Sequence, residues 1–430
     1  MNNSPNNTLH SNLTTKVSDP ARLDRTEPVT QSSEVLQSAI KFSQWLEKVG
    51  YASHDPYDVW GTRYGCWARK IYYQRGKIGL PLVAPLLLID TVIPRFPRRF
   101  LKKCRYATAD AQLILAFLNL DQVRSDENWL NKAKVLGDEV LAYSIPGYSG
   151  YCWGYPFDWQ NNKGMWPKNT PFITCTPYCF EAYLKLFEVT KEDRYFEIVQ
   201  SIAEFIFNDL HDVPDGDDAA AGSYSPIDRS MVVNATAYRA WVLLEAGTRF
   251  NRPDFREAAL RHVRFILKHQ AEDGSWLYAV GNNAEKFIDH FHTCFVLKNL
   301  FKLNRELDSP EVRESIEKGY RYYREHLFDA AGNPKYFAIE PRFQLTRLEL
   351  YNFAEAITLG ALLGDEIPES MEMAEDLAKR IINEHQLGEG YFVTRVFRGG
   401  FKHTTPFLRW PQAQLFLALT NLAAKNIPLA

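Results

Sequence analysis

The same helical pattern restarts every 58 to 60 residues through most of this chain, and no other feature of the sequence limits its fold so strongly. An apolar stretch opens at each of five regularly spaced positions, which are Thr176, Asn234, His292, Tyr351 and Pro411. A fixed period of this length indicates repeated supersecondary units that bury their apolar faces against one another. Residues at equivalent positions of the units are therefore expected to come together in space.

The second half of each unit predicts another helix, because apolar residues recur there at three- and four-residue spacing. These outer helices are expected over Arg194–Leu210, Asp254–His269, Glu311–Leu327 and Glu369–His385. An earlier unit supplies an inner helix over Thr108–Leu120 and an outer helix over Asn128–Tyr143, with an insertion at 146–171. Val35–Val49 can supply a sixth outer helix beside the last inner one.

Six two-helix units that close into a ring make an all-α fold, the (α/α)6 toroid. The inner helices are expected to be apolar nearly all round, because they touch both their outer helices and each other. Their predicted starts lie near residues 108, 176, 234, 292, 351 and 411. A glycine and an aromatic residue follow the outer helices, which predicts short β-hairpin turns at these places.

Length and composition favour one large domain. The repeat is continuous in a chain of 430 residues, which predicts a single domain over 34–430. Residues 1–33 are rich in Asn, Ser, Thr and Pro, which predicts a disordered tail, and they lack the pattern of a signal peptide. Apolar residues make up 46% of the chain, enough for a large core, and the net charge of −2 points to no nucleic-acid partner.

The cysteines predict the compartment. None of the six forms a CxxC pair, so we expect free thiols in a reducing environment and a cytoplasmic protein. They are Cys66, Cys104, Cys152, Cys175, Cys179 and Cys294. The sequence contains no metal-binding cluster, phosphate loop or nucleotide fingerprint, so neither a metal nor another cofactor is expected.

Residues 77–105 do not fit the repeat. They form an apolar run interrupted by prolines and followed by several Arg and Lys residues, too short and broken for the ~20 apolar residues of a membrane-spanning helix. One interpretation is an interfacial segment that contacts acidic lipids of the inner membrane or a polysaccharide synthesis complex. The other is an extra helix on the ring with a solvated basic end. The sequence leaves both open.

All inner helices of such a ring point the same way, so their N-termini gather at one mouth. Each brings unpaired backbone N–H groups and a positive dipole end, which suit polar or anionic ligands such as carboxylate-bearing sugars. When the repeats are aligned, several side chains that could bind a ligand or take part in catalysis fall at this mouth. They are Asp228, Arg229, Asn234, His290, His292, Arg347, Glu349, Tyr351, Asn352, Glu355, His403, Arg409 and Trp410. Helix capping is the alternative role for Thr176, Asn234 and Asp289.

The insertion at 146–171 adds aromatic residues with an acid among them. Trp153, Tyr155 and Trp159 flank Asp158, and sugar sites use such rings because the apolar faces of pyranoses stack on them. The alternative is that these rings only plug one end of the ring of helices.

The repeat, the glycine-aromatic turns and the segment WGYPFDWQ at Trp153–Gln160 resemble the six-hairpin glycosidase-like superfamily. From Val35 onward the chain is similar, within that superfamily, to VpsJ-type proteins of bacterial exopolysaccharide clusters. The resemblance implies a toroid that takes an oligosaccharide or polysaccharide in polysaccharide biosynthesis or processing. The superfamily includes glycoside hydrolases, polysaccharide lyases and sugar epimerases, so it does not fix the reaction.

Two reactions compete. A glycoside hydrolase needs two carboxylates that flank the bond, and Asp158 and Asp228 are the candidates, with Glu349 in reserve. We favour hydrolysis because the superfamily is richest in hydrolases. A uronate lyase or epimerase instead needs a base near C5 of the sugar and a cation on its carboxylate. Candidates for these roles are His292 and Tyr351 with Arg409, and the resemblance to epimerases of this fold adds His403.

Two further functions stay open. A glycan-binding scaffold could keep the mouth without catalysis. A terpene cyclase is least favoured, although Gln270…Gly274…Trp276 matches a turn motif of cyclases and Asp215–Asp218 matches their D-x-D-D acid motif. The glutamine-glycine-tryptophan match is a structural turn of helical toroids. The acidic match is expected in a glycine-containing loop, whereas the catalytic acid of a cyclase must lie in a dry cavity.

Overall fold

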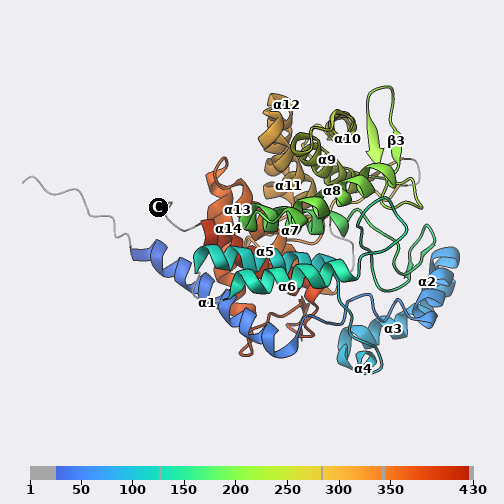
Figure 1. Cartoon of the computed structure of the whole chain (residues 1–430). Coiled ribbons are helices and arrows are strands. Elements are labelled where there is room, and N and C mark those ends of the chain that lie inside the picture. The colour runs from blue at the N-terminus through green and yellow to red at the C-terminus, as the bar shows by residue number, and fades with distance from the viewer. Residues whose placement is uncertain (1–25, 125–127, 282–283, 340–343, 426–430) are drawn as a thin grey trace, which may run out of the picture.

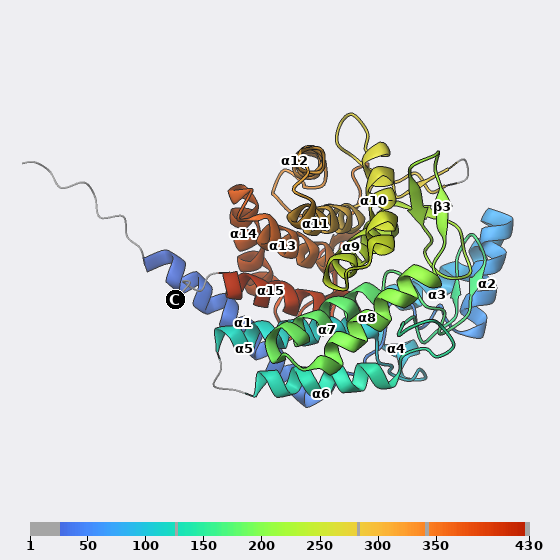
Figure 2. The ribbon, with the colours of Figure 1, turned by 45° about the horizontal axis from the view of Figure 1, so that its top comes forward.

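The computed structural model describes residues 26–430 apart from 125–127, 282–283, 340–343 and 426–430. Its inner helices form a closed ring in which each contacts the next and the last contacts the first (Figure 1 and Figure 2). In chain order they are α5 (Ala107–Val123), α7 (Thr176–Thr190), α9 (Val233–Arg249), α11 (His290–Leu307), α13 (Leu350–Leu363) and α15 (Ala413–Lys425). The predicted (α/α)6 toroid is confirmed.

Outer helices cover this ring, and each packs against the inner helix of its own unit. They are α6 (Trp129–Ala142), α8 (Asp193–Asn208), α10 (Pro253–Lys268), α12 (Pro310–His326), α14 (Pro368–His385) and α1 (Thr26–Val49). As predicted, α1 completes the last unit, and the rings of Phe42 and Phe416 lie with their centroids 4.9 Å apart between α1 and α15.

Helix boundaries lie close to the predicted ones, with one informative difference. The last inner helix begins at Ala413 rather than near 411, because a π-helical segment, Leu408–Gln412, precedes it. Within that segment Trp410 has an extended backbone, with φ −156° and ψ 98°. The domain boundary before residue 34 stays a prediction, since residues 1–25 lie outside the described residues and α1 begins at Thr26.

Short antiparallel strands lie in the links that follow α6, α8, α10, α12 and α14, as the turn pattern predicts. β1 (Trp159–Gln160) pairs with β2 (Met165–Trp166), β3 (Asp212–Pro214) with β4 (Ala220–Gly222), and β5 (Met231–Val232) with β6 (Ala279–Val280). In the remaining sheet, β8 (Arg395–Phe397) lies between β7 (Thr346–Glu349) and β9 (Lys402–His403). β5 and β7 lead directly into α9 and α13, so they fix where those helices begin.

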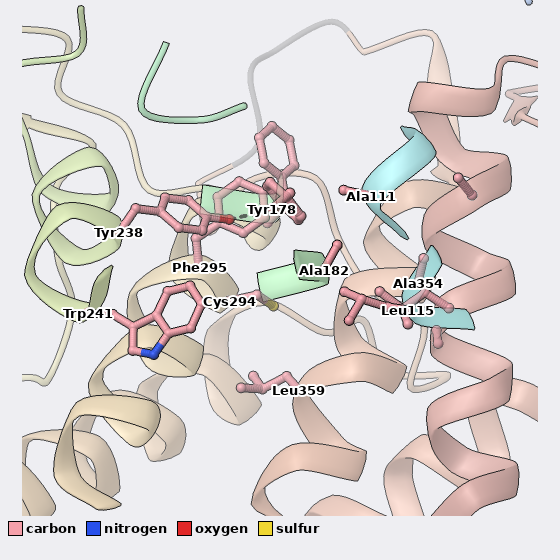
Figure 3. Packing of buried hydrophobic residues seen from close by; sticks show 14 of the residues in the cluster. Ala111, Leu115, Tyr178, Ala182, Tyr238, Trp241, Cys294, Phe295, Ala354 and Leu359 are labelled. Atoms are coloured by element: carbon pink, nitrogen blue, oxygen red, sulfur yellow. Dashed lines mark hydrogen bonds between the residues drawn. The ribbon is translucent and has the colours of Figure 1, made fainter. Parts of the chain in front are cut away.

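The core extends between the inner and outer helices as well as between neighbouring inner helices. In α13 every residue is buried except Thr358 and Leu362, as expected for a helix with neighbours on all sides. Figure 3 shows Tyr178, Tyr238 and Phe295, which come from three inner helices and pack together in the core. The two tyrosine hydroxyls are hydrogen-bonded at 2.8 Å, so these buried polar groups satisfy each other.

Glutamine-glycine turns tie successive outer helices together. The Gln270 amide donates to the Ser315 carbonyl of α12 at 2.9 Å, and the Gln386 amide donates to the Ser38 carbonyl of α1 at 3.1 Å. The turn that resembles the cyclase motif therefore has the structural role that the sequence predicts. The acidic stretch Asp215–Asp218 lies in the link between β3 and β4, also as predicted.

Between α1 and α5 the chain leaves the repeat. It forms α2 (Arg63–Arg75), a 3-10 turn (Gly76–Gly79), α3 (Leu80–Val92) and α4 (Arg95–Arg98), which Figure 1 shows in blue at one side of the ring. We call residues 63–105 the α2–α4 arm. Residues 77–105 thus include helices outside the repeated units.

Two further observations concern the whole described chain. No helix of the described residues combines the length and the apolar character that crossing a bilayer requires. All six cysteines are free thiols, and four of them are buried, in agreement with the sequence.

Candidate active site

The strongest candidate site lies at the N-terminus of α11, where a carboxylate holds a histidine ring. Asp289 is the N-cap of α11, and its side chain accepts the backbone N–H of His292 at 3.0 Å. The same carboxylate oxygens lie 2.8 and 2.9 Å from Nδ1 of His292. Since a carboxylate only accepts, Nδ1 is the donor of this hydrogen bond, and in the neutral imidazole Nε2 therefore keeps a lone pair. An oriented imidazole of this kind can act as a general base.

Both members of the pair are shielded, but to different degrees. The Asp289 side chain is 3% exposed, whereas the His292 side chain is 20% exposed and can be reached from the mouth. The rings of Tyr278 and Phe287 pack on the imidazole, with centroid distances of 4.6 and 6.0 Å. The Asp289 side of the pair is therefore shielded from water, which strengthens the hydrogen bond between its members.

Asn234, on the neighbouring helix α9, faces the same space with an unused amide. Its side-chain nitrogen and oxygen are buried and have no hydrogen-bond partner among the described residues. Asn234, Asp289 and His292 together line a cavity of about 10 Å³, the size of roughly one water molecule. A buried amide without partners costs stability, so this one is suited to receive a hydroxyl of a bound molecule. Asn234 is not a helix cap, because α9 is capped at Val232.

A second cavity, of about 160 Å³, adjoins the first through the ring of Tyr278, which lines both. Its walls are aromatic, with contributions from Tyr57, Trp159, Trp166, Tyr224 and Tyr278. The insertion supplies the two tryptophans through the β1–β2 hairpin, where their rings meet edge to face at 5.2 Å. The hairpin therefore supplies part of the aromatic wall of this cavity, and it includes Trp159, a residue that the sequence predicts for the site.

Charges at the aromatic cavity favour an anion. Arg69 and Lys163 line it together with a single acid, Glu285, which accepts a hydrogen bond from Asn162. The guanidinium of Arg69 lies over the rings of Tyr57 and Trp60, at 5.4 and 4.9 Å, and forms no ion pair with another described residue. It is therefore free to pair with a carboxylate.

Arg409 was the cation expected to bind a uronate, and the structure gives it another partner. Its Nε and one terminal nitrogen donate to the two oxygens of Asp55 at 2.6 and 2.8 Å, and both side chains are buried. Burial opposes the charge on Arg409, but the facing Asp55 holds its pKa well above the ordinary value. This pair anchors the 51–62 segment, whose Tyr57 lines the aromatic cavity, so Arg409 holds a wall of that cavity rather than a ligand.

The three carboxylates expected to hydrolyse a glycosidic bond are engaged locally. Asp158 accepts the backbone N–H of Lys168 at 2.8 Å, and Asp228 accepts those of Tyr224 and Ser225, both at 2.9 Å. These two carboxylates shape their own loops, and neither lines the two cavities described above.

Glu349 lies in a different part of the mouth. Its carboxylate is bound by Arg395 at 2.5 Å and by the indole N–H of Trp410 at 3.2 Å. Together with Tyr336 and Arg395 it lines a third cavity, of about 310 Å³. Both contacts come from the protein itself, so the Glu349 carboxylate already has partners among its neighbours.

Several expected residues lie below the mouth, in the core. Tyr351 is 3% exposed and stacks on Trp410 with centroids 3.8 Å apart. Glu355 is fully buried and bound by Lys298 at 2.5 Å. Asn352 donates to the carbonyl of Lys335 at 3.3 Å. Burial raises the pKa of Tyr351 well above its ordinary value, so this phenol stays protonated.

Other expected residues have structural contacts. Trp153 is buried, and its indole N–H donates to the Val140 carbonyl of α6 at 3.0 Å. His290 is buried between α11 and α12, with one ring nitrogen 3.2 Å from the Leu327 carbonyl and the other 2.8 Å from the Tyr323 hydroxyl. His403 is 4% exposed in strand β9, and burial lowers its pKa to about 3. We assign these three residues structural roles.

The remaining expected residues lie at the edges of the mouth. Arg229 and Arg347 are exposed to solvent. Tyr155 is partly buried under the guanidinium of Arg409, 4.8 Å from its ring centroid, so it supports the Asp55–Arg409 pair.

Sequence reasoning missed part of the site. Tyr57 and Arg69 precede the repeat, where no aligned column exists, and Trp166 and Tyr224 lie in irregular links. Tyr278 could have been found, since it follows the repeated glycine-aromatic turn by two positions. Among the described residues, no group of three or more His, Cys, Asp or Glu side chains is placed to hold a metal ion.

Comparison with known proteins supports the fold. No family model matches this chain, and no curated protein matches it significantly. Among solved structures, an unsaturated glucuronyl hydrolase specific for heparin has a TM-score of 0.61 at 11% identity, over 91% of this chain and 96% of that one. A family 76 α-mannanase from Bacteroides thetaiotaomicron has 0.55 at 10% identity, over 74% and 86%.

A third solved structure, a sugar epimerase from a ruminal bacterium, has a TM-score of 0.55 at 10% identity, over 76% of this chain and 89% of that one. At such low identities the likeness concerns the fold and not the reaction. The chain therefore shares the (α/α)6 toroid fold with these solved structures.

Proposed function

We propose that this protein is a carbohydrate-active enzyme that removes a proton from an acidic sugar, as uronate-directed lyases and epimerases do. The observation that carries the proposal is the Asp289–His292 pair beside the unpartnered amide of Asn234. The adjoining aromatic cavity, of about 160 Å³, has room for one sugar ring rather than for a long stretch of chain. The solved structures of similar fold include carbohydrate enzymes of several reaction types, which is consistent with such a substrate.

The chemistry follows from the groups present. The C5–H of a uronate becomes acidic when the neighbouring carboxylate is neutralised, a role that Arg69 can fill. Nε2 of His292 then takes the C5 proton while Asp289 stabilises the imidazolium that forms. In a lyase, the C4–O bond breaks, a C4–C5 double bond forms and the departing sugar oxygen takes a proton. In an epimerase, a proton returns to C5 from the opposite face.

Hydrolysis through Asp158 and Asp228 stays the alternative that the sequence favours. It receives less support, because both carboxylates accept backbone hydrogen bonds in their own loops. A glycan-binding scaffold remains the non-catalytic alternative.

The biological setting is also part of the proposal. The resemblance to VpsJ-type proteins supports a role in exopolysaccharide biosynthesis in the cytoplasm. The contact with a membrane or with a polysaccharide synthesis complex that the sequence predicts through residues 77–105 belongs to the same proposal.

Purified wild-type protein should be incubated with uronate-containing polysaccharides. Ultraviolet absorbance detects the unsaturated product of a lyase, NMR detects an epimer, and a reducing-end assay detects hydrolysis. We expect His292→Asn to lower the rate by about 10²–10⁴-fold, the usual contribution of a general base. Asp158→Asn and Asp228→Asn, which remove the hydrolytic candidates, should retain activity. Full activity in His292→Asn with loss in either aspartate variant would establish hydrolysis, and glycan binding without turnover would establish a scaffold.

A further inference from the structure

The α2–α4 arm exposes an unusual amount of apolar surface. Of the helix Leu80–Val92, which is apolar on nearly every side, only Val83 is buried. Leu88 is 63% exposed, and beyond the ends of this helix Ile78 is 73% and Phe100 78% exposed. A helix that is apolar all round is normally buried on all sides. The exposed sides of this helix therefore lack a partner surface in the isolated chain.

The same arm carries a strong positive charge. Between residues 63 and 105 the sequence contains 11 Lys and Arg residues and a single acid, Asp90, although the whole chain has a net charge of −2. Arg98 is the buried exception: it pairs with Asp90 at 2.5 Å and fixes α4 in place. Among the described residues, Arg63, Lys77 and Arg99 have no ion-pair partner. The cover that fits this surface is both apolar and anionic.

A cationic cavity opens beside these apolar side chains. It measures about 460 Å³ and lies between the end of α1, α4 and the segment before α15. Arg95, Arg99 and Lys103 line it with His54, and no Asp or Glu is among its described lining residues. Trp45, Tyr391 and Leu408 form its apolar side. The volume suits a small-molecule group, and the charge suits a phosphate.

We infer that the α2–α4 arm docks on an anionic phospholipid bilayer, with a lipid headgroup phosphate in the cavity of Arg95, Arg99 and Lys103. Exposed apolar side chains such as Leu88 and Phe100 enter the boundary between headgroups and acyl chains, and the surrounding cations contact the lipid surface. This inference deepens the proposed membrane contact but does not depend on the reaction at His292.

The arm also connects the bilayer to the mouth. On α2, Arg69 and Tyr73 line the aromatic cavity, while Tyr64 and Trp67 on the same helix are 49% and 48% exposed. Docking through the arm therefore places the candidate active site next to the membrane surface, where a lipid-linked or membrane-assembled glycan would be presented.

The first test is flotation of the full chain with phosphatidylcholine vesicles, with and without phosphatidylglycerol. Binding is expected only with phosphatidylglycerol, and it should weaken as salt shortens the Debye length from ~30 Å at 0.01 M to ~8 Å at 0.15 M. Leu87→Ser/Leu88→Ser should abolish it. If the wild type does not bind protein-free vesicles, the inference is overturned. The same conclusion holds if the wild type binds a polysaccharide synthesis complex but not the vesicles.

A matched pair of double variants separates the cavity from general electrostatics. Arg99→Gln/Lys103→Gln and Arg63→Gln/Lys77→Gln each remove two exposed cations of the arm, but only the first pair lines the cavity. The loss of two cations from the general electrostatic attraction should weaken vesicle binding about 30-fold in either variant. We expect a clearly larger loss for the cavity variant, and equal losses would overturn the headgroup site.

Two controls complete the experiment. Arg321→Gln/Lys379→Gln, on α12 and α14, makes the same charge change away from the arm and should bind vesicles like the wild type. Inorganic phosphate probes the alternative source of the anion. If free phosphate binds in the cavity and the protein does not bind vesicles, the lipid assignment is overturned. If the protein still binds vesicles in the presence of free phosphate, the assignment is supported. The reaction at the mouth is measured separately, so its failure would leave this result intact.

Discussion

His290 and His292 stand two positions apart on one helix and have different surroundings. His290 is buried with both ring nitrogens engaged by the protein, and burial lowers its pKa to about 3. His292 is partly exposed, with one nitrogen held by Asp289 and the other available. Two positions on a helix differ by about 200° around its axis, so only one of the two rings can face the mouth.

Asp289 has two separable roles, as a helix cap and as the group that orients His292. Asp289→Ser keeps an oxygen that caps α11 but removes the charged acceptor for Nδ1, whereas Asp289→Ala removes both. We expect both variants to lower kcat about 10-fold or more with little change in KM. Only Asp289→Ala should also lose about 1 kcal/mol of stability. Wild-type kcat in Asp289→Ser would contradict the positioning role.

Buried neutral histidines make folding stability depend on pH. Burial lowers the pKa of His290 and of His403 to about 3, whereas a histidine of the unfolded chain titrates near ~6.5. The unfolded state therefore binds more protons as the pH falls below ~6.5, and the free energy of unfolding decreases. Each of these histidines should contribute a loss of about 2 kcal/mol between about pH 7 and pH 5.

Urea denaturation at several pH values checks this expectation. His290→Gln should be less stable than the wild type near neutral pH, yet lose less stability on acidification, by about the 2 kcal/mol given above. His326→Gln, at a histidine whose side chain is 51% exposed, is the control for the substitution itself. An unchanged pH dependence in His290→Gln would count against a neutral, buried His290.

At the scale of elements, the glycine turns determine how closely successive outer helices approach. Gly274 has φ +91°, and a Cβ at this position would lie 2.3 Å from the Lys318 carbonyl of α12. Gly216 has φ +92°, but the nearest atom to its Cβ would be the end of the flexible Lys268 side chain, at 3.6 Å. Both glycines therefore have a positive φ that strains other residues, but only Gly274 lies so close to a neighbouring helix that a Cβ would clash with it.

Gly274→Ala should therefore destabilise the protein more than Gly216→Ala does. The excess should be about 1–3 kcal/mol, the usual cost of overpacking, because α12 has to move away from the turn. Thermal and urea unfolding of the two variants measure the difference. Equal destabilisation would show that only the positive φ matters at Gly274.

The repeated elements could be predicted from the sequence, and the arm could not. Apolar residues at helical spacing recur with a fixed period, so the twelve helices of the ring and their order follow from the pattern. In the α2–α4 arm, Leu80–Val92 is apolar on all sides, so the pattern does not indicate which side faces the ring. What covers such a helix depends on its surroundings rather than on its periodicity.

At the scale of the molecule, one ion pair joins the 51–62 segment to the residues before the last inner helix. Asp55 and Arg409 are separated by 354 positions and are both buried. Removing one partner of a buried pair leaves an uncompensated charge, so Asp55→Ala should cost about 3–5 kcal/mol. The double variant Asp55→Leu/Arg409→Met should recover part of this loss. Urea denaturation measures both, and a loss under about 1 kcal/mol in Asp55→Ala, as at exposed pairs, would contradict this role.

The same pair shows why the site was only partly predictable. The repeat aligns Asn234 with His292, and the two residues line one cavity, because helix starts share one level along the ring. It could not show that Arg409 already has a partner, since Asp55 lies outside the repeat and far away in sequence. Nor could it show how far each side chain is rotated about its helix, which separates His292 from His290.

Closure of the ring by α1 and α15 has a consequence for the order of events during synthesis. Ser38 and Gln386, which hold α1 against the last units, are 348 positions apart. A ribosome therefore delivers α1 well before α14 and α15, and the apolar face that includes Phe42 stays uncovered until those helices have emerged. Contacts over such a distance form slowly, and apolar surface that waits for them is prone to aggregation. Efficient folding of this toroid in cells is thus expected to depend on chaperones that shield α1 while translation proceeds.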